Sequence, residues 1–340
     1  MTSGGEVSRG VLKKLINDPF DAVDEMLEGF IAVHSDVVRL AAERVVARIP
    51  NERSKVGLVI GGGSGHEPAF LGHVGLGLAD AAAVGNIFAA PSPDVCLDAI
   101  RAASTGMGVL LVYGNYAGDV MNFGIAADRA ADEGIEVRTV LVTDDVASAP
   151  ESENDRRRGI AGMVVVFKCA GAMAERGATL DDVERIARAT NAATRSMGVA
   201  LSPCEVPGAG RLSFELAADE MEVGLGLHGE PGMRRGPLLT ADETAEILIE
   251  TILADLPSRS GHEVALLVNG LGATAQLDLY ILYRAARRAL ERAGNLVRRS
   301  IVGEYITSLE MAGASVTVTL LDDELTGLLD APARAARFVR

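Results

Sequence analysis

Short apolar runs alternate with helical stretches through the first half of this chain, and that alternation constrains the fold more than any other feature. The apolar runs span residues 56–60, 81–84, 108–112, 137–142 and 163–167, and the helical stretches include residues 93–103, 120–132 and 171–176. Continuous apolar runs rich in β-branched residues are typical of strands buried on both faces. Strands that alternate with helices indicate a parallel sheet, so the chain is predicted to have an α/β fold.

Two flanking regions complete the predicted element order. Residues 21–49 carry apolar side chains at helical spacing, such as Val23, Leu27 and Phe30, and are predicted to form a helical entry layer. In the second half of the chain, the hydrophobic pattern predicts helices over residues 180–197, 240–253 and 277–293 and strands over residues 264–268 and 315–321. Thr179 is placed to cap the first of these helices.

The length of the chain predicts two domains. It has 340 residues, and single hydrophobic cores stop growing at roughly 250 to 300 residues. We expect a first α/β domain over residues 1–179, with a mainly parallel sheet flanked by helices, and a smaller second α/β domain over residues 180–340. The first would carry His66 and Asp119, and the second would carry His228.

Charge and hydropathy exclude some partners. A formal net charge of −15 repels polyanions, because nucleic-acid binding depends on basic side chains that displace counterions from phosphates. The arginines at residues 156–158 follow three acidic residues and are interpreted as a solvated loop. No apolar run approaches the ~18 residues of a membrane span, so we expect no membrane partner and a cytoplasmic location.

No metal site or disulfide is predicted. Cys96, Cys169 and Cys204 are far apart and lack the spacing of a disulfide framework or a zinc site. The Asp pairs at residues 144–145, 181–182 and 322–323 are interpreted as surface turns or helix caps, since they form no aspartate-rich metal loop.

Two glycine-dense loops, each with a histidine near a Glu-Pro step, are the strongest functional signal. Residues 61–68 read GGGSGHEP and residues 224–232 read GLGLHGEPG. The first loop follows a predicted strand, and ligands of parallel sheets bind at the carboxyl ends of strands. It lacks the Gly-Lys-Ser/Thr of a P-loop and does not fit GxGxxG. The alternatives are a tight turn with a hydrogen-bonded histidine, or a site in which Gly63, Ser64 and Gly65 face a hydroxylated ligand beside His66.

Asp119 and His228 have both structural and chemical interpretations. Asp119 lies just after a predicted strand, at the start of a predicted helix, where a carboxylate acts as a cap or as a general base for a hydroxyl proton. His228 is flanked by a leucine and a glycine, which leaves a ring edge accessible. Its neutral imidazole is a nucleophile suited to a ketone, although a lone histidine is usually structural.

Six segments occur in one order along the chain and carry a family resemblance. They read GGGSGHEP, GNYAGDVMNF, RRGIAGMVVVFKCAGAMAE, LGLHGEPG, NGLG and VGEYITSLEMAGASVTVTLL. From about residue 13 to residue 321 the chain resembles the substrate-binding subunit of the dihydroxyacetone kinase family. The resemblance implies a two-domain α/β subunit, usually a homodimer, that binds dihydroxyacetone or a similar short ketose covalently.

The resemblance also implies roles for individual residues. His228 would add to the substrate carbonyl through Nε2 and form a hemiaminal, Asp119 would take the proton of the hydroxyl to be phosphorylated, and His66 would hydrogen-bond and polarise the adduct. Gly63, Ser64 and Gly65 would line the pocket.

One position departs from the family pattern, which commonly has a lysine where this chain has Gly114. Without the alkyl stem and the ammonium group of that lysine, the pocket would lose a hydrogen-bond donor and gain space for roughly one or two heavy atoms of the substrate. The substrate could therefore be a four-carbon ketose such as erythrulose.

Phosphoryl transfer needs a nucleotide cradle and magnesium, and the sequence provides neither motif. We expect that this chain binds no cofactor itself and that a separate nucleotide-binding subunit holds Mg-ATP, or Mg-ADP recharged by a phosphotransferase relay. A non-catalytic ketose sensor is the main alternative, although an intact Asp119 and His66 favour an enzyme. A third interpretation, a dinucleotide-dependent oxidoreductase, is supported only by the alternation of strands and helices, because the chain lacks a dinucleotide-binding fingerprint loop.

Overall fold

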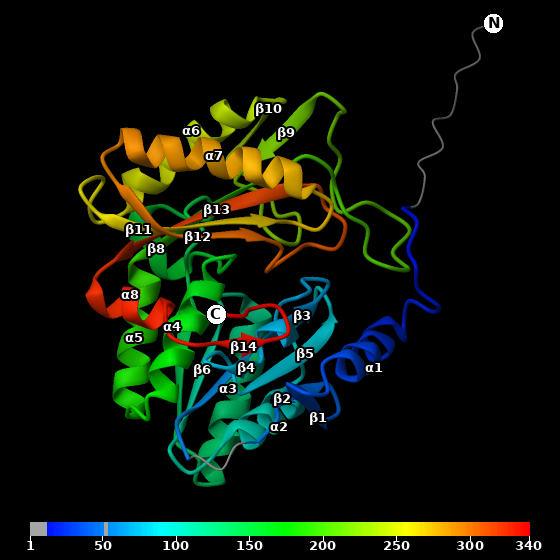
Figure 1. The fold of residues 1–340 in the computed structure, drawn as a ribbon. Coiled ribbons are helices and arrows are strands. Elements are labelled where there is room, and N and C mark those ends of the chain that lie inside the picture. Colours follow the sequence, from blue (N-terminus) through cyan, green and yellow to red (C-terminus); the bar gives the residue numbers. More distant parts are fainter. Residues whose placement is uncertain (1–11, 51–53) are drawn as a thin grey trace, which may run out of the picture.

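The protein contains two six-stranded sheets, one in each half of the molecule (Figure 1). The computed structural model describes residues 12–50 and 54–340. In sheet order, the first sheet consists of β1 (Val38–Ala42), β2 (Val45–Arg48), β5 (Ala81–Ile87), β3 (Gly57–Ser64), β6 (Val109–Gly114) and β7 (Val137–Val142). β5, β3, β6 and β7 pair in parallel, whereas β1 and β2 add an antiparallel edge. The predicted mainly parallel sheet is confirmed.

Helices cover both faces of the first sheet. α2 (Pro93–Ala103) and α3 (Ala117–Asp132) pack on the face that includes Val59, and α4 (Met163–Glu175) packs on the face that includes Leu58 and Ile60. α5 (Leu180–Ala192) lies against α4, and α1 (Ala22–Val33) lies beside β1. Because successive residues of β3 are buried on opposite faces, the strand carries an unbroken apolar run from Leu58 to Ile60, as the sequence indicates.

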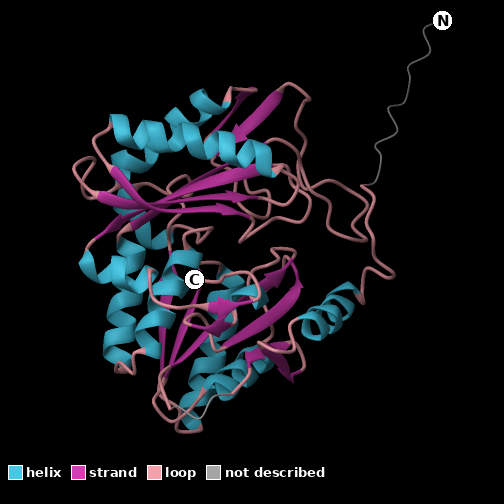
Figure 2. Cartoon of the chain, viewed as in Figure 1, coloured by secondary structure: helices cyan, strands magenta, loops and turns pink. Residues whose placement is uncertain are grey.

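The second sheet is mostly antiparallel. In sheet order it consists of β10 (Arg234–Pro237), β9 (Glu220–Val223), β8 (Thr194–Ala200), β13 (Gly313–Leu321), β11 (Glu263–Gly270) and β12 (Leu296–Gly303). Only β11 and β12 run parallel. α6 (Ala241–Asp255) and α7 (Gln276–Arg292) pack together on the face turned away from the first sheet (Figure 2). Thr240 and Glu243 form a capping box that begins α6.

The predicted helical entry layer is correct only for α1. Residues 38–48 form the hairpin of β1 and β2 instead, with Arg44 in the left-handed region at φ 55°. The apolar side chains of Val38, Val45 and Val46 are buried against the first sheet. β-Branched residues favour strands, and pairing with β5 completes the sheet, so tertiary structure overrides the helical spacing.

Two other predicted elements have different boundaries or types. Residues 163–167 are the first turns of α4 and not a strand, because this helix is buried on all sides from Met163 to Ala174 and therefore reads as a continuous apolar run. The helix predicted over residues 180–197 ends at Ala192, since the next residues enter β8 and pair with β13.

The end of the chain returns to the first sheet's side of the molecule. α8 (Asp323–Leu329) packs on α4, and β14 (Arg334–Ala335) pairs with β4 (Gly75–Leu76). Two short 3-10 turns, Leu71–His73 and Glu151–Arg156, complete the secondary structure. The two sheets fall on either side of residue 180, but the domain boundary itself stays a prediction. None of the helices within residues 12–50 and 54–340 is long and apolar enough to cross a bilayer.

Candidate functional site

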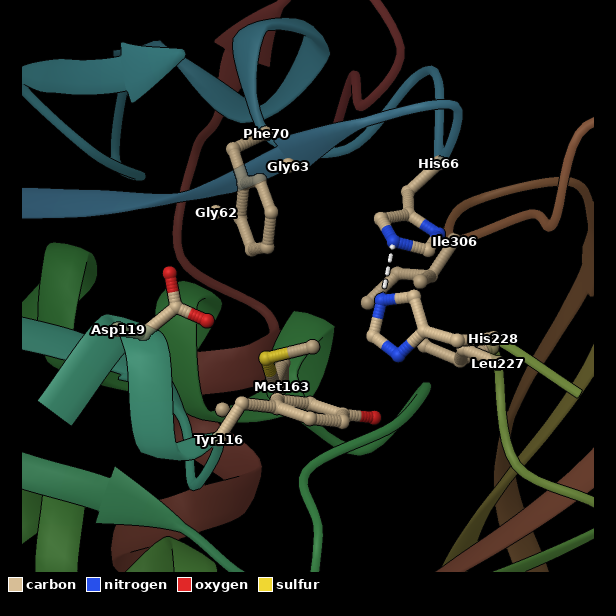
Figure 3. A pocket seen from close by; sticks show the side chains of 11 residues that line it. Gly62, Gly63, His66, Phe70, Tyr116, Asp119, Met163, Leu227, His228 and Ile306 are labelled. Atoms are coloured by element: carbon tan, nitrogen blue, oxygen red, sulfur yellow. Dashed lines mark hydrogen bonds between the residues drawn. The ribbon is translucent and has the colours of Figure 1, made fainter. Parts of the chain in front are cut away.

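One cavity brings the two glycine-rich loops together with the start of α3 (Figure 3). Five of the predicted site residues line it: Gly63, His66, Gly114, Asp119 and His228. The space between the lining residues is about 320 Å³, including solvent at the opening. His228 and Asp119, which lie in different halves of the chain, therefore share a single cavity.

The first loop fixes His66 through a distant partner. The loop continues from β3, and His66 is only 4% exposed. Its Nδ1 lies 2.7 Å from the carbonyl oxygen of Thr307, and because a carbonyl oxygen can only accept, Nδ1 donates and Nε2 keeps its lone pair. Burial, with the nearby charge of His228, lowers the pKa of His66 to about 3. His66 is therefore neutral near pH 7, with a hydrogen-bond acceptor facing the cavity.

The neighbours of His66 in the loop serve different purposes. The Ser64 hydroxyl donates to the carbonyl oxygen of Gly85 at 2.8 Å, and the Gly65 amide donates to the Glu67 carboxylate at 2.9 Å. The partner of Ser64 lies in β5 and the partner of Gly65 lies in the loop itself, and neither Ser64 nor Gly65 lines the cavity, unlike Gly63. The pocket role predicted for Ser64 and Gly65 thus has no contact to support it, because the Ser64 hydroxyl ties the loop to β5 and the Gly65 amide bonds within the loop.

The second loop holds His228 by a short-range contact. The Glu230 carboxylate accepts the backbone N–H of His228 at 2.9 Å and lies 3.1 Å from the ring Nδ1. Gly229 lies between them with φ 85°, in the left-handed region that favours glycine. The His228 side chain is 28% exposed, and its ring packs edge-on against Phe88 and Tyr116. The ring is therefore oriented but still open to an entering molecule.

The two histidines meet through their Nε2 atoms. Nε2 of His66 and Nε2 of His228 are 3.1 Å apart, and the ring planes are inclined by 69° (Figure 3). Any carbonyl group that reaches Nε2 of His228 must consequently come within hydrogen-bonding distance of His66.

Asp119 occupies the first turn of α3 without capping it. The cap position is Tyr116, which has no capping side-chain hydrogen bond, and Asp119 is the third helical residue. Asp119 is 9% exposed, and its Oδ1 has no hydrogen-bond partner in the described part of the chain. Burial raises the pKa of Asp119 to about 7, although the charge of His228 opposes the rise. A carboxyl group that titrates near neutral pH and faces a cavity is suited to general base catalysis.

Tyr116 occupies the space beside Gly114. A Cβ at Gly114 would lie 3.0 Å and 3.1 Å from two carbons of the Tyr116 ring. The Tyr116 hydroxyl donates to the carbonyl oxygen of Gly159 at 3.1 Å, and the ring lines the cavity below His228. The space that a lysine side chain would take is thus partly filled by this ring. Tyr116 was not among the predicted site residues, because its position beside Gly114 follows from the sharp turn between β6 and α3.

A buried ion network supports the second loop, and it corrects two interpretations. Arg158 was expected in a solvated loop, yet it bonds the buried Asp145 carboxylate and lies 3.6 Å from Glu230. Arg157 is also buried and pairs with Asp255 through two hydrogen bonds of 2.7 Å and 2.6 Å. The desolvation free energy of a buried charge is partly offset when the charge is paired with an opposite one, which is why these arginines tolerate burial. Only the first arginine of the cluster is exposed.

The three Asp pairs differ in their surroundings. Asp144 and Asp145 are buried, and Asp144 accepts the backbone N–H groups of Ile160 and Gly162 just before α4, so they are not a surface turn. Asp322 caps α8, as expected, whereas Asp181 and Asp182 lie in the first turn of α5, which Thr179 caps. Within residues 12–50 and 54–340, no three His, Cys, Asp or Glu side chains are grouped closely enough to hold a metal ion.

Known proteins with the same sequence features cover nearly the whole chain. Residues 28–337 match the Dak1 domain family. A Listeria innocua protein, the dihydroxyacetone-binding subunit DhaK of PTS-dependent dihydroxyacetone kinase 2, is 46% identical over 330 residues, which are 96% of this chain and 99% of that protein. A D-erythrulose kinase of Mycolicibacterium smegmatis is 46% identical over 322 residues, which cover 95% of this chain and 56% of that protein.

A solved structure is also similar to this chain over most of its length. The dihydroxyacetone kinase operon co-activator Dha-DhaQ matches with a TM-score of 0.88 and 33% sequence identity, over 93% of this chain and 98% of that chain.

Proposed function

Because the chain belongs to the Dak1 domain family, we propose that it is the substrate-binding subunit of a short-ketose kinase of the dihydroxyacetone kinase type. The Listeria relative, which matches over 96% of this chain, is a dihydroxyacetone-binding subunit. The chain is thus a phosphotransferase subunit that acts with a separate subunit supplying the phosphoryl donor. The observation that carries the assignment is the single cavity shared by His228 and Asp119.

We propose that His228 binds the ketose covalently. Its Nε2 lone pair attacks the carbonyl carbon, the π electrons move to the oxygen, and the oxygen takes up a proton to become a hydroxyl group. Nε2 of His66 lies 3.1 Å from the attacking nitrogen and, as an acceptor, receives the hydrogen bond of that hydroxyl group. A polyol has no carbonyl carbon, so this bond selects ketoses.

Phosphoryl transfer then requires a base and a donor. In the proposal, Asp119 removes the proton of the terminal hydroxyl while the partner subunit presents the phosphoryl group from Mg-ATP or Mg-ADP. A pKa of about 7 lets the Asp119 carboxylate take the proton near neutral pH. We also propose a homodimer in the cytoplasm, as the family resemblance implies.

A four-carbon ketose is the second candidate substrate. Gly114 replaces the lysine expected from the family pattern, and an erythrulose kinase is as similar to this chain as the Listeria subunit is. Comparison of dihydroxyacetone with both erythrulose enantiomers tests this candidate. A strong preference for the triose would reject it.

A ketose sensor remains the non-catalytic candidate, since the similar structure Dha-DhaQ is a co-activator. Asp119 favours the enzyme, because its Oδ1 is buried without a hydrogen-bond partner among the residues that the structure describes, a costly arrangement, and a sensor has no use for a base.

Two measurements test the proposed function. Intact-protein mass spectrometry of the chain mixed with dihydroxyacetone should show addition of the whole ketose, because a hemiaminal forms without loss of water. Addition of a nucleotide-binding partner subunit with its donor should then yield a ketose phosphate. Absence of turnover despite adduct formation would favour the sensor, and absence of an adduct would reject covalent binding.

A further inference from the structure

We propose that Glu230 is a positioning residue that fixes the nucleophilic tautomer of His228 and balances the charge of the covalent adduct. The inference rests on the proposed covalent attachment of a ketose to His228. It adds the group that makes Nε2, and not Nδ1, the attacking atom.

The Glu230 carboxylate forms hydrogen bonds with both the backbone and the ring of His228. One oxygen accepts the backbone N–H of His228 at 2.9 Å, and the other lies 3.1 Å from Nδ1. An ionised carboxylate has no proton to donate, so Nδ1 must carry the hydrogen and the lone pair must lie on Nε2. In the opposite tautomer, Nε2 would be protonated and could not attack a carbonyl carbon.

A second ion pair holds Glu230 ionised and in place. Nη1 of Arg158 lies 3.6 Å from the Glu230 carboxylate, and Arg158 is itself anchored by Asp145 at 2.8 Å and 3.0 Å. A Cβ at Gly226 would come within 2.2 Å of Arg158 and 2.3 Å of Glu230, so only glycine lets this pair close. Although burial alone raises the pKa of Glu230, the contact with His228 and the charge of Arg158 lower it to about 2.

The partner of His66 makes the effect of Glu230 stronger. Thr307 requires a proton on Nδ1 of His66, just as Glu230 requires one on Nδ1 of His228. When both rings are neutral, the two Nε2 lone pairs therefore face each other across 3.1 Å, and the hydrogen bond between these atoms (Figure 3) forms when His228 also carries a proton on Nε2. An electrophilic carbon that bonds to Nε2 of His228, and a hydroxyl group that donates to His66, would relieve this repulsion.

The charge balance of the adduct gives Glu230 its second effect. When Nε2 bonds to the carbonyl carbon, the C=O π pair moves to the oxygen, which takes a proton from solvent. The ring then carries carbon on Nε2 and hydrogen on Nδ1, so it is a cation 3.1 Å from an anionic carboxylate. A charge-assisted hydrogen bond is stronger than a neutral one, so Glu230 stabilises the adduct more than the free ring.

The experiment compares Glu230→Gln and Glu230→Ala with the control Glu222→Gln. Glu222 is also buried, but its carboxylate bonds Arg235 and the backbone of Gly232 and does not contact His228. Histidine ¹⁵N chemical shifts of the ligand-free full chain report the tautomer, and titration with dihydroxyacetone followed by intact mass spectrometry reports the adduct.

We expect the wild type and Glu222→Gln to carry the His228 proton on Nδ1. Glu230→Ala should move it to Nε2, and Glu230→Gln should weaken adduct formation about 10- to 100-fold, in line with loss of one hydrogen bond to a charged group. In Glu230→Gln the adduct should also lose its Nδ1 proton at a lower pH than in the wild type. A merely structural role would move neither the tautomer nor this pH profile.

Two outcomes would overturn the proposal: a His228 proton that stays on Nδ1 in Glu230→Ala, or an adduct in Glu230→Gln with wild-type affinity and pH profile. If Glu230→Ala does not fold, the Glu230→Gln arm decides. Failure of the wild type to form an adduct would instead reject the proposed function, while the tautomer of the ligand-free protein would still test the positioning role.

Discussion

The two glycine-rich histidine loops have similar sequences but hold their imidazoles in different ways. His66 is 4% exposed and takes its hydrogen-bond partner from Thr307, 241 residues away in the sequence. The His228 side chain is 28% exposed and takes its partner from Glu230, two residues away. A distant neutral acceptor and a nearby anion give the same tautomer, but only the second can balance a positive charge on the ring. The comparison therefore assigns the fixed acceptor role to His66 and the nucleophilic role to His228.

The largest expected effect separates the two histidines directly. His228→Ala should abolish the covalent adduct and lower kcat/KM by more than about 10³-fold, since loss of a nucleophile removes the covalent step entirely. His66→Ala should leave the adduct detectable, because the attacking atom remains. Intact mass spectrometry of both variants with dihydroxyacetone tests this. The assignment of the nucleophilic role to His228 would be wrong if His228→Ala still formed the adduct. It would also be wrong if His66→Ala formed no adduct while His228→Ala did.

The next effect separates binding from transfer. Asp119→Asn should still form the adduct but lower turnover about 10²- to 10⁴-fold, the usual contribution of a general base. Mass spectrometry checks the first part, and ketose phosphorylation in the presence of the partner subunit checks the second. An unchanged rate would remove Asp119 from the role of base.

The smallest effect concerns pH. The ordinary pKa of an aspartate is near 3.8, and burial raises that of Asp119 to about 7. The base is active when ionised, so kcat/KM of the complete kinase should rise roughly tenfold between pH 6 and pH 8. His66, with a pKa of about 3, should add no step in this range. A flat profile, or a rise that persists in Asp119→Asn, would contradict the assignment to Asp119.

Local sequence patterns predicted the residues of the site better than its supporting groups. Gly63 and His66 were identified from a glycine-rich loop after a strand, and His228 was identified from the second glycine-rich loop. Asp119 was identified from its place at the start of a helix, and Gly114 from its departure from the family pattern. All five line the cavity. Their chemical roles stay predictions. The parallel strands and the helices that flank them were also predictable, because each has an unbroken apolar run or a helical period of its own.

The supporting groups could not be predicted because their significance depends on contacts between distant residues. Arg158 looks solvated in the sequence, since nothing local shows that it is paired with Asp145 and Glu230. The partner of His66 is the backbone carbonyl group of residue 307, and because every residue type has this group, the sequence does not indicate the contact. One signal was available for Glu230, whose place two residues after a loop histidine allows a short-range contact.

The Thr307 contact has a consequence for the order of folding. Because the carbonyl group that sets the His66 tautomer is synthesised 241 residues after the ring itself, a nascent chain that has folded only its first sheet has an incompletely defined imidazole. The hydrogen-bond acceptor that His66 presents to the cavity is therefore fixed only once both halves of the molecule have folded against each other.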